Sequence, residues 1–263
     1  MGKCNSKNIK SSDEYKLLKI LSYNVRLIYD SPIRAKNISY FLSTRYKINY
    51  DIICLQCIYN ENSKQEIIDI LKNTYPYIEP TNEKIGFLIF SKYKILNYEF
   101  IKYDIDNKIE CNGYLYVNII INDTIITIYN IIFQPDYKSL ILNENIRFKQ
   151  IEEIKNNILK NNDNNIIFII GSLNIKGKNI NKYSDEYNNF FNNNFIDLNN
   201  IKKNEQLYSD NRNDYILLYN NTNEQKNIKI LKLLNIILLK MSFIDVDYSD
   251  HYPLELFVIL KIK

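Results

Sequence analysis

Short apolar segments that end on polar residues recur along this chain, and they constrain its fold more than any other feature. Residues 166–170 are the clearest case, because five consecutive apolar side chains lead into Gly171-Ser172-Leu173-Asn174. Runs of this length and composition are typical of strands buried inside a protein. The other segments expected to form strands are 17–25, 51–57, 86–91, 113–121, 124–133, 214–219 and 254–262.

Helical patterns separate these strands. Residues 34–46 place Ile38, Phe41 and Leu42 on one face. A capping-box pattern at 63–66 predicts a helix that continues to Lys72. Residues 143–160 form the longest amphipathic pattern, with inward positions Ile146, Ile151, Ile154 and Ile158. Strands mixed with helices in this way predict an α/β protein in which two packed sheets are covered by helices.

The chain has 263 residues, of which 46% are hydrophobic, so it can bury a full core. It lacks a Gly/Pro/Ser-rich linker, and we expect a tail at 1–16 and one domain at 17–263. Four cysteines give no disulfide framework, and the sequence has neither a secretory signal pattern nor an apolar run of membrane-spanning length. We therefore expect an intracellular protein. The net charge is only +4, and basic and acidic residues are interspersed along the chain, which argues against nucleic acid as a partner.

The N-terminus fits an N-myristoylation pattern. Gly2 follows the initiator methionine, Ser6 occupies the expected position, and Cys4 is placed for a second acyl chain. One myristoyl chain binds membranes only marginally, so the second signal matters. This interpretation places the protein at the cytoplasmic face of a membrane, and the alternative is an ordinary tail that happens to begin Met-Gly.

The chain has a single histidine, His251, directly after Asp250. A carboxylate can fix the tautomer of an imidazole and raise its basicity, as a general base near neutral pH requires. The alternative is a histidine that neighbours an acid by chance.

Five polar segments in order carry a family resemblance: 21–25 (Leu-Ser-Tyr-Asn-Val), 51–56 (Asp-Ile-Ile-Cys-Leu-Gln), 171–174, 214–216 (Asp-Tyr-Ile) and 248–251 (Tyr-Ser-Asp-His). Together they resemble the endonuclease/exonuclease/phosphatase superfamily, and within it the bacterial-type neutral sphingomyelinases. The resemblance implies a four-layered α/β sandwich with the active site at strand ends between two sheets. It also implies Mg²⁺-dependent cleavage of a phosphodiester by an activated water.

Position by position, the resemblance assigns roles to the surviving residues. Asn24 would help hold the metal site, and Asn174 would contact the phosphate or orient the water. Asp214 would be a supporting carboxylate. His251, oriented by Asp250, would be the general base.

Three family positions differ in this chain. Cys57 stands where the resemblance implies the principal metal-binding glutamate, Ser172 where it implies an aspartate, and Ile132 where it implies a histidine that protonates the leaving group. Mg²⁺ prefers carboxylate and carbonyl oxygens, whereas a thiolate suits softer metals. Cys54 is expected to face away from Cys57, because residues three apart on a regular strand lie on opposite faces.

The leading hypothesis is thus a membrane-associated protein with a sphingomyelinase-like fold that has lost efficient hydrolysis, and with it the Mg²⁺ of the family. Such a protein would bind a phospholipid membrane or a phosphodiester head group, or act as a scaffold. The first alternative is an active Mg²⁺-dependent phosphodiesterase that uses Glu61 as a substitute ligand, although we expect Glu61 to face water. The second is a nuclease. The aliphatic segment 228–243 predicts a hairpin, and its Ile236-Ile237 is either a membrane-contacting tip or part of the core.

Overall fold

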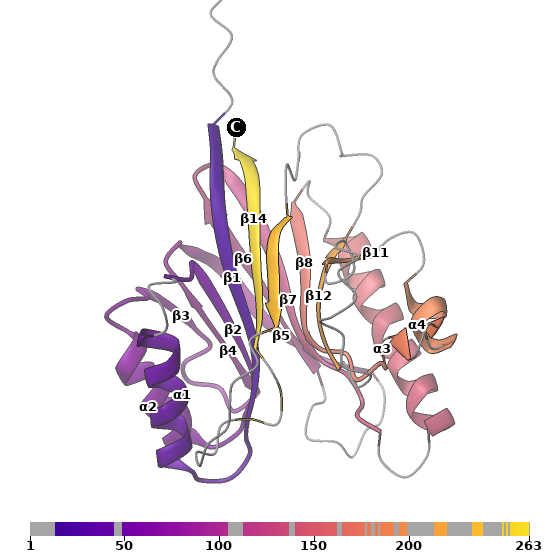
Figure 1. Ribbon diagram of the computed structural model, residues 1–263, viewed down its shortest axis with the longest axis horizontal. Coiled ribbons are helices and arrows are strands. Elements are labelled where there is room, and N and C mark those ends of the chain that lie inside the picture. The colour runs from indigo at the N-terminus through magenta and orange to yellow at the C-terminus, as the bar shows by residue number, and fades with distance from the viewer. Residues whose placement is uncertain are drawn as a thin grey trace, which may run out of the picture.

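Two six-stranded sheets dominate the computed structural model shown in Figure 1. The structure describes residues 14–44, 49–104, 113–136, 140–161, 165–176, 178–179, 182–183, 185–191, 195–198, 213–219, 233–238, 249, 251 and 253–262. Gly2, Cys4 and Asp250 lie outside these residues, so the lipidation motif and the Asp250 contact stay predictions.

The first sheet has a single parallel pair, formed by β1 and β2, and its other neighbouring strands are antiparallel. Its strands in spatial order are β13 (Leu233–Leu238), β14 (Leu254–Ile262), β1 (Glu14–Leu27), β2 (Ile52–Ile58), β4 (Gly86–Ser91) and β3 (Tyr77–Glu79).

The second sheet repeats this plan, with β7 and β8 as its parallel pair. Its strands in order are β11 (Phe195–Asp197), β12 (Asp214–Tyr219), β8 (Ile166–Ser172), β7 (Thr124–Ile132), β6 (Gly113–Ile121) and β5 (Ile95–Lys102). Strands β9 (Lys178–Asn179) and β10 (Lys182–Tyr183) pair with each other in a separate two-stranded ribbon.

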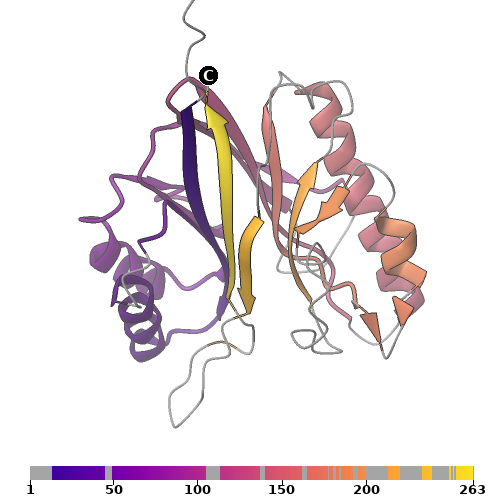
Figure 2. The same cartoon turned by 45° about the horizontal axis from the view of Figure 1, so that its top comes forward.

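The sheets pack face to face through an apolar core, and helices cover their outer faces (Figure 2). Helices α1 (Pro32–Thr44) and α2 (Glu61–Leu71) lie against the first sheet, and α3 (Leu140–Lys160) and α4 (Asp185–Phe190) lie against the second. Each helix layer has its own buried cluster, so three cores separate four layers. The predicted α/β sandwich is confirmed. No helix among the described residues is long and apolar enough to cross a membrane.

Most predicted elements are present with shifted ends. Strands 86–91, 113–121, 214–219 and 254–262 match β4, β6, β12 and β14. The predicted helix 34–46 begins two residues earlier, at Pro32, which suits the first turn of a helix because its missing N–H would have no partner there. Segment 228–243 contributes β13, which pairs with β14, and its side chains and flanking residues lie outside the described set.

Two predictions of local structure are wrong. The cap of α2 is Asn60, whose side chain accepts a hydrogen bond from the Ser63 backbone N–H at 2.9 Å, so Ser63 lies inside the helix. Asn is as good a cap as Ser, and the capping-box pattern had placed the cap three residues late, at Ser63. The edge strands β3 and β5 were not predicted, because their half-exposed mixed sequences lack an apolar run.

Candidate active site

Strand ends from both sheets bring four polar side chains together. Asn24 lies near the end of β1 and His251 lies just before β14, both on the first sheet. Ser172 ends β8 and Asp214 begins β12, and these two residues are paired neighbours in the second sheet. The site therefore sits where the two sheets meet, as the resemblance implies.

A closed ring of hydrogen bonds joins these four residues, which we call the four-residue ring. The Asn24 Nδ2 amide donates to Ser172 Oγ at 2.9 Å. Ser172 Oγ in turn donates to Asp214 Oδ1 at 2.5 Å. Because the serine proton goes to the carboxylate, Ser172 is not arranged as the nucleophile of a Ser–His–Asp triad, in which histidine accepts that proton.

His251 completes the ring. Its Nδ1 lies 2.8 Å from Asp214 Oδ2, and its Nε2 lies 3.3 Å from Asn24 Nδ2. A carboxylate only accepts and an amide nitrogen only donates, so neutral His251 carries its proton on Nδ1 and accepts at Nε2. The nitrogen that a general base would use is thus already engaged by Asn24.

The backbone around the ring is tied down as well. Ser249 Oγ donates to the Asn24 carbonyl oxygen at 2.6 Å and accepts from the His251 N–H at 3.2 Å. The Ser249 N–H reaches the Tyr23 hydroxyl at 3.3 Å. These bonds fix the segment before β14 against β1, so the position of His251 depends on the serine of the Tyr-Ser-Asp-His motif.

Asp214 has a larger part than the sequence suggested. The described partner of His251 Nδ1 is Asp214, from a strand in the other sheet, whereas the sequence pointed to the adjacent Asp250 as the orienting carboxylate. The side chains of His251 and Asp214 keep 15% and 14% of their surface exposed, while Ser172 has none. The ring therefore meets solvent on its histidine side.

Two of the three substituted positions belong to the core between the sheets. Cys57 and Ile132 are both buried members of that apolar cluster. Cys57 sits in an irregularity of β2 and has a φ of +59°. The irregularity breaks the alternation of the strand, so Cys54 and Cys57 both join the inter-sheet core, and the expectation that they face opposite ways is wrong.

Gln56 and Asn130 form a polar connection between the sheets beside these residues. Gln56 Nε2 donates to Asn130 Oδ1 at 2.8 Å, and Asn130 Nδ2 donates to the Leu55 carbonyl oxygen at 3.1 Å. Gln56 Oε1 is buried and has no hydrogen bond. Sequence reasoning gave neither residue a role, although a polar residue inside each buried strand was a signal.

Asn174 lies outside the four-residue ring. Its φ is +55°, and its Nδ2 donates to the Phe133 carbonyl oxygen at 2.6 Å. The Phe133 N–H in turn donates to the Ser172 carbonyl oxygen at 2.9 Å. Asn174 therefore links the exits of β7 and β8, and none of the hydrogen bonds described for its side chain reaches His251 or Asn24.

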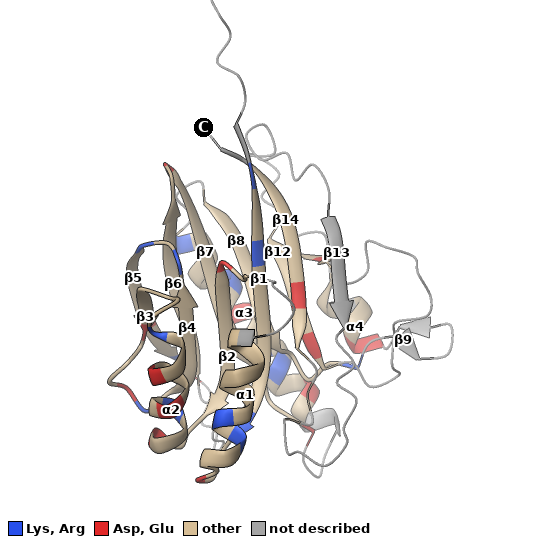
Figure 3. Cartoon of the chain, turned by 60° about the vertical axis from the view of Figure 1, so that its left-hand side comes forward, with Lys and Arg blue, Asp and Glu red and all other residues tan. Residues whose placement is uncertain are grey.

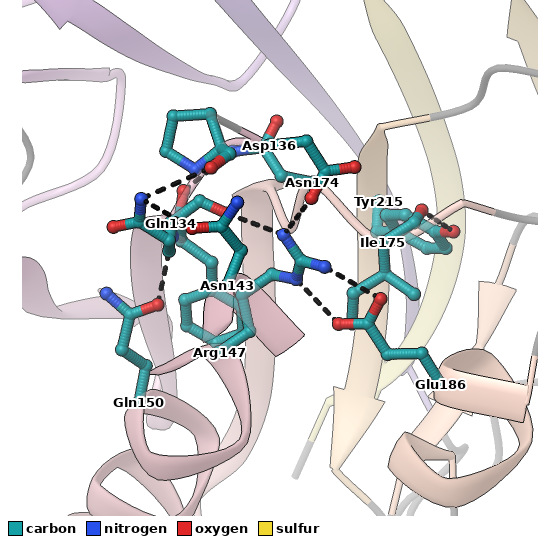
Figure 4. Close-up of polar contacts among 11 residues, drawn as sticks. Gln134, Asp136, Asn143, Arg147, Gln150, Asn174, Ile175, Glu186 and Tyr215 are labelled. Atoms are coloured by element: carbon teal, nitrogen blue, oxygen red, sulfur yellow. Dashed lines mark hydrogen bonds and ion pairs between the residues drawn. The ribbon is translucent and has the colours of Figure 1, made fainter. Parts of the chain in front are cut away.

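Arg147 from α3 supports this part of the site (Figure 4). Its guanidinium is buried and makes two bonds to the Glu186 carboxylate at 2.6 and 2.8 Å. A third nitrogen–oxygen contact joins Nη1 to Asp136 Oδ1 at 2.8 Å, and the same nitrogen donates to the Gln134 carbonyl oxygen at 2.9 Å. Arg147 thus fixes the segment after β7 that also receives the Asn174 side chain.

The described residues of the site do not fit Mg²⁺. Asp214 is the carboxylate of the four-residue ring, and both of its oxygens already accept hydrogen bonds. No group of three or more His, Cys, Asp or Glu side chains suitable for a metal occurs among the described residues. Burial raises the pKa of the Cys54 thiol, which disfavours the thiolate that a soft metal would need.

Glu61 is not fully exposed, contrary to expectation. It is the first residue of α2 and is half-buried, and its Oε1 is enclosed without a hydrogen bond. Its charge raises the pKa of nearby Lys64, opposing the larger lowering caused by burial of that amine. This enclosed oxygen is what the rewired-site alternative would use, but none of the described hydrogen bonds joins Glu61 to the four-residue ring.

Charged residues are mixed in sign over the described elements. Figure 3 shows both acidic and basic positions on the elements of one side, with basic positions on α1 and β1 and an acidic position on β14. This distribution gives no support to the nuclease hypothesis, which needs a continuous basic track.

Comparisons with known proteins agree on the fold. No protein-family model and no curated protein matches the chain by sequence. Among solved structures, sphingomyelinase C from Streptomyces griseocarneus is 16% identical with a TM-score of 0.68, covering 92% of this chain and 99% of its own. A humanized D. rerio TDP2 is 17% identical with a TM-score of 0.69, covering 92% and 98%.

A mutant beta toxin from Staphylococcus aureus with bound magnesium ions is 19% identical with a TM-score of 0.64, covering 94% of this chain and 99% of that protein. These TM-scores, over more than 90% of each chain, establish a shared fold. The chain therefore has the endonuclease/exonuclease/phosphatase fold that its strand-end motifs suggested.

The buried Arg147 generates a prediction about stability. Arg147→Met leaves the Glu186 and Asp136 carboxylates without their partner and should lower the free energy of unfolding by about 3–5 kcal/mol. Lys72→Met is the matched control, because Lys72 pairs with Asp69 at the surface and its loss should cost less than about 1 kcal/mol. Urea unfolding measures both.

The loss should also depend on pH. Burial raises the pKa of Glu186, and the hydrogen bonds from Arg147 lower it. On balance the pKa of Glu186 is raised even with Arg147 in place, and removing Arg147 should raise it further, so the stability lost in Arg147→Met should become smaller as the pH falls toward about 5. A defect that is unchanged over this range would contradict the described pairing.

Proposed function

We propose that this chain, which has a phosphodiesterase-type fold, binds a phosphate-containing head group at a membrane surface and does not hydrolyse it efficiently. The four-residue ring carries the proposal. It holds the amide and imidazole groups that can recognise a phosphate, while Cys57 and Ile132 extend the apolar core to the place where catalytic groups are implied.

The chemistry of binding follows from the ring. A phosphate oxygen can accept from Asn24 Nδ2 by displacing His251 Nε2, which is the longest contact of the ring at 3.3 Å. Protonation of His251 would give Nε2 a proton to donate to the same oxygen, in a charge-assisted hydrogen bond. Asp214 would stabilise that imidazolium through Nδ1.

Hydrolysis lacks its usual contributors. Positioned acid–base groups typically contribute about 10²–10⁴-fold each. Ile132 has no proton to give, and Ser172 and Cys57 do not bring the charge that holds a hard metal. Because such groups act as a unit, their losses do not simply multiply. The expected outcome is a strongly impaired enzyme.

Membrane association belongs to the same proposal. Acylation at Gly2, with Cys4 as a second site, would place the protein on the cytoplasmic face of a membrane. The alternative function is an active Mg²⁺-dependent phosphodiesterase in which the enclosed Glu61 carboxylate serves as ligand.

A hydrolysis assay separates these functions. With Mg²⁺ and sphingomyelin, the native protein should release phosphocholine at least about 10²-fold more slowly than sphingomyelinase C from Streptomyces griseocarneus. The variant combining Cys57→Glu, Ser172→Asp and Ile132→His should be less stable without metal, because it buries unpaired polar groups. Mg²⁺ should then raise its melting temperature and leave that of the native protein unchanged.

Comparable hydrolysis by the native protein would overturn the proposal. Glu61→Gln would then identify the alternative, because only a rewired site loses turnover when that carboxylate is neutralised.

Binding is tested with soluble phosphocholine. The ligand should shift the ring resonances of the single histidine, and Asn24→Ala should weaken the effect by roughly tenfold, as expected for loss of a hydrogen bond to a charged group. Choline, which lacks the phosphate, is the control and should leave His251 unchanged. An equal response to choline would show that the ring does not recognise phosphate.

A further inference from the structure

Helix α1 carries an exposed apolar stripe that the four-residue ring does not explain. Its inner face packs on the first sheet through Ala35, Ile38, Phe41 and Leu42. On the outer side, Ile33 and Tyr40 keep 74% and 66% of their surface exposed. They are seven residues apart, which is about two helical turns, so they lie on one face.

The stripe continues beyond the helix. Tyr29 precedes α1 by one turn and is 81% exposed, which is the largest value among the exposed large hydrophobic side chains of the described residues. We define the α1 stripe as Tyr29, Ile33, Lys36 and Tyr40. Three large, exposed apolar side chains thus fall within twelve residues of sequence, whereas single exposed ones need no explanation.

Basic residues accompany the stripe. Lys36 lies within it and is exposed, Arg26 is exposed at the end of β1, and half-buried Arg34 donates to the Val25 carbonyl oxygen. Asp30 is the acid among these neighbours. Figure 3 shows basic residues gathered at the lower end of α1. Tyrosines, an aliphatic side chain and an excess of basic residues are the composition that anionic lipid interfaces attract.

The direction of β1 gives a second reason to expect a lipid surface here. Glu14 begins this strand and Asn24 lies ten residues further, which separates them by roughly 33 Å. The α1 stripe follows directly after the Asn24 end of β1 and supplies a contact there.

We propose that the α1 stripe is a membrane-contact surface for anionic bilayers, which orients the four-residue ring toward lipid head groups. This inference rests on the proposed function and assigns the surface that serves it. Tyrosine rings and Ile33 would enter the interfacial region, and Lys36 would pair with lipid phosphates or carboxylates.

The experiment is vesicle sedimentation with the full-length Gly2→Ala protein, so that no acyl chain contributes. Vesicles of phosphatidylcholine containing phosphatidylserine should bind it, and pure phosphatidylcholine should bind it more weakly. Ile33→Ser should reduce binding by about tenfold. Lys36→Ala should reduce it roughly fivefold on anionic vesicles only.

Leu159→Ser is the matched control, because Leu159 is 65% exposed on α3, over the opposite sheet. It should leave vesicle binding unchanged. Equal binding by Ile33→Ser and the Gly2→Ala protein, equal losses in Ile33→Ser and Leu159→Ser, or no vesicle binding at all would overturn the proposal. A change in self-association with Ile33→Ser and none in vesicle binding would make the stripe a protein interface instead.

Soluble phosphocholine separates this inference from the function on which it rests. The α1 variants should keep the phosphocholine response of His251. If that response is absent in every protein while Ile33→Ser still loses vesicle binding, the head-group function fails and the membrane surface stands.

Discussion

The apolar contact between the two sheets is the constraint on which the site depends. In this fold the two sheets pack face to face, and the side chains near their strand ends form either part of the core or the active site. In this chain Cys57 and Ile132 belong to the core, and the remaining polar groups close on one another. In the four-residue ring, the amide, hydroxyl and carboxylate satisfy one another's hydrogen bonds. A partly satisfied set of the same buried groups would be costly.

The weak hydrolysis that we propose would follow from the ring and the core together. An aspartate at position 172 would place a second carboxylate against Asp214, an arrangement that a cation or a proton shared between the two carboxylates would have to stabilise. Serine removes this repulsion and instead donates a hydrogen bond to Asp214. Serine at 172 is thus compatible with a site that needs no cation, as the proposed function implies.

Much of this could be predicted from the sequence. The apolar runs located most strands, and the polar residues at their ends identified Asn24, Ser172, Asp214 and His251, which the structure brings together. The pairing of His251 with Asp214 could not be predicted, because it joins two sheets over 37 residues of sequence, whereas Asp250 is merely adjacent. The irregularity at Cys57 was likewise invisible, since no glycine marks its positive φ.

The most direct test uses the single histidine. Nitrogen-15 NMR of His251, at a pH where the ring is neutral, reports which nitrogen carries the proton. The ring requires the proton on Nδ1, with Nε2 as acceptor, and predicts that adding Mg²⁺ leaves both resonances in place. A proton on Nε2, or a shift on adding Mg²⁺, would show that the histidine is free to serve a metal-dependent site and would contradict this account.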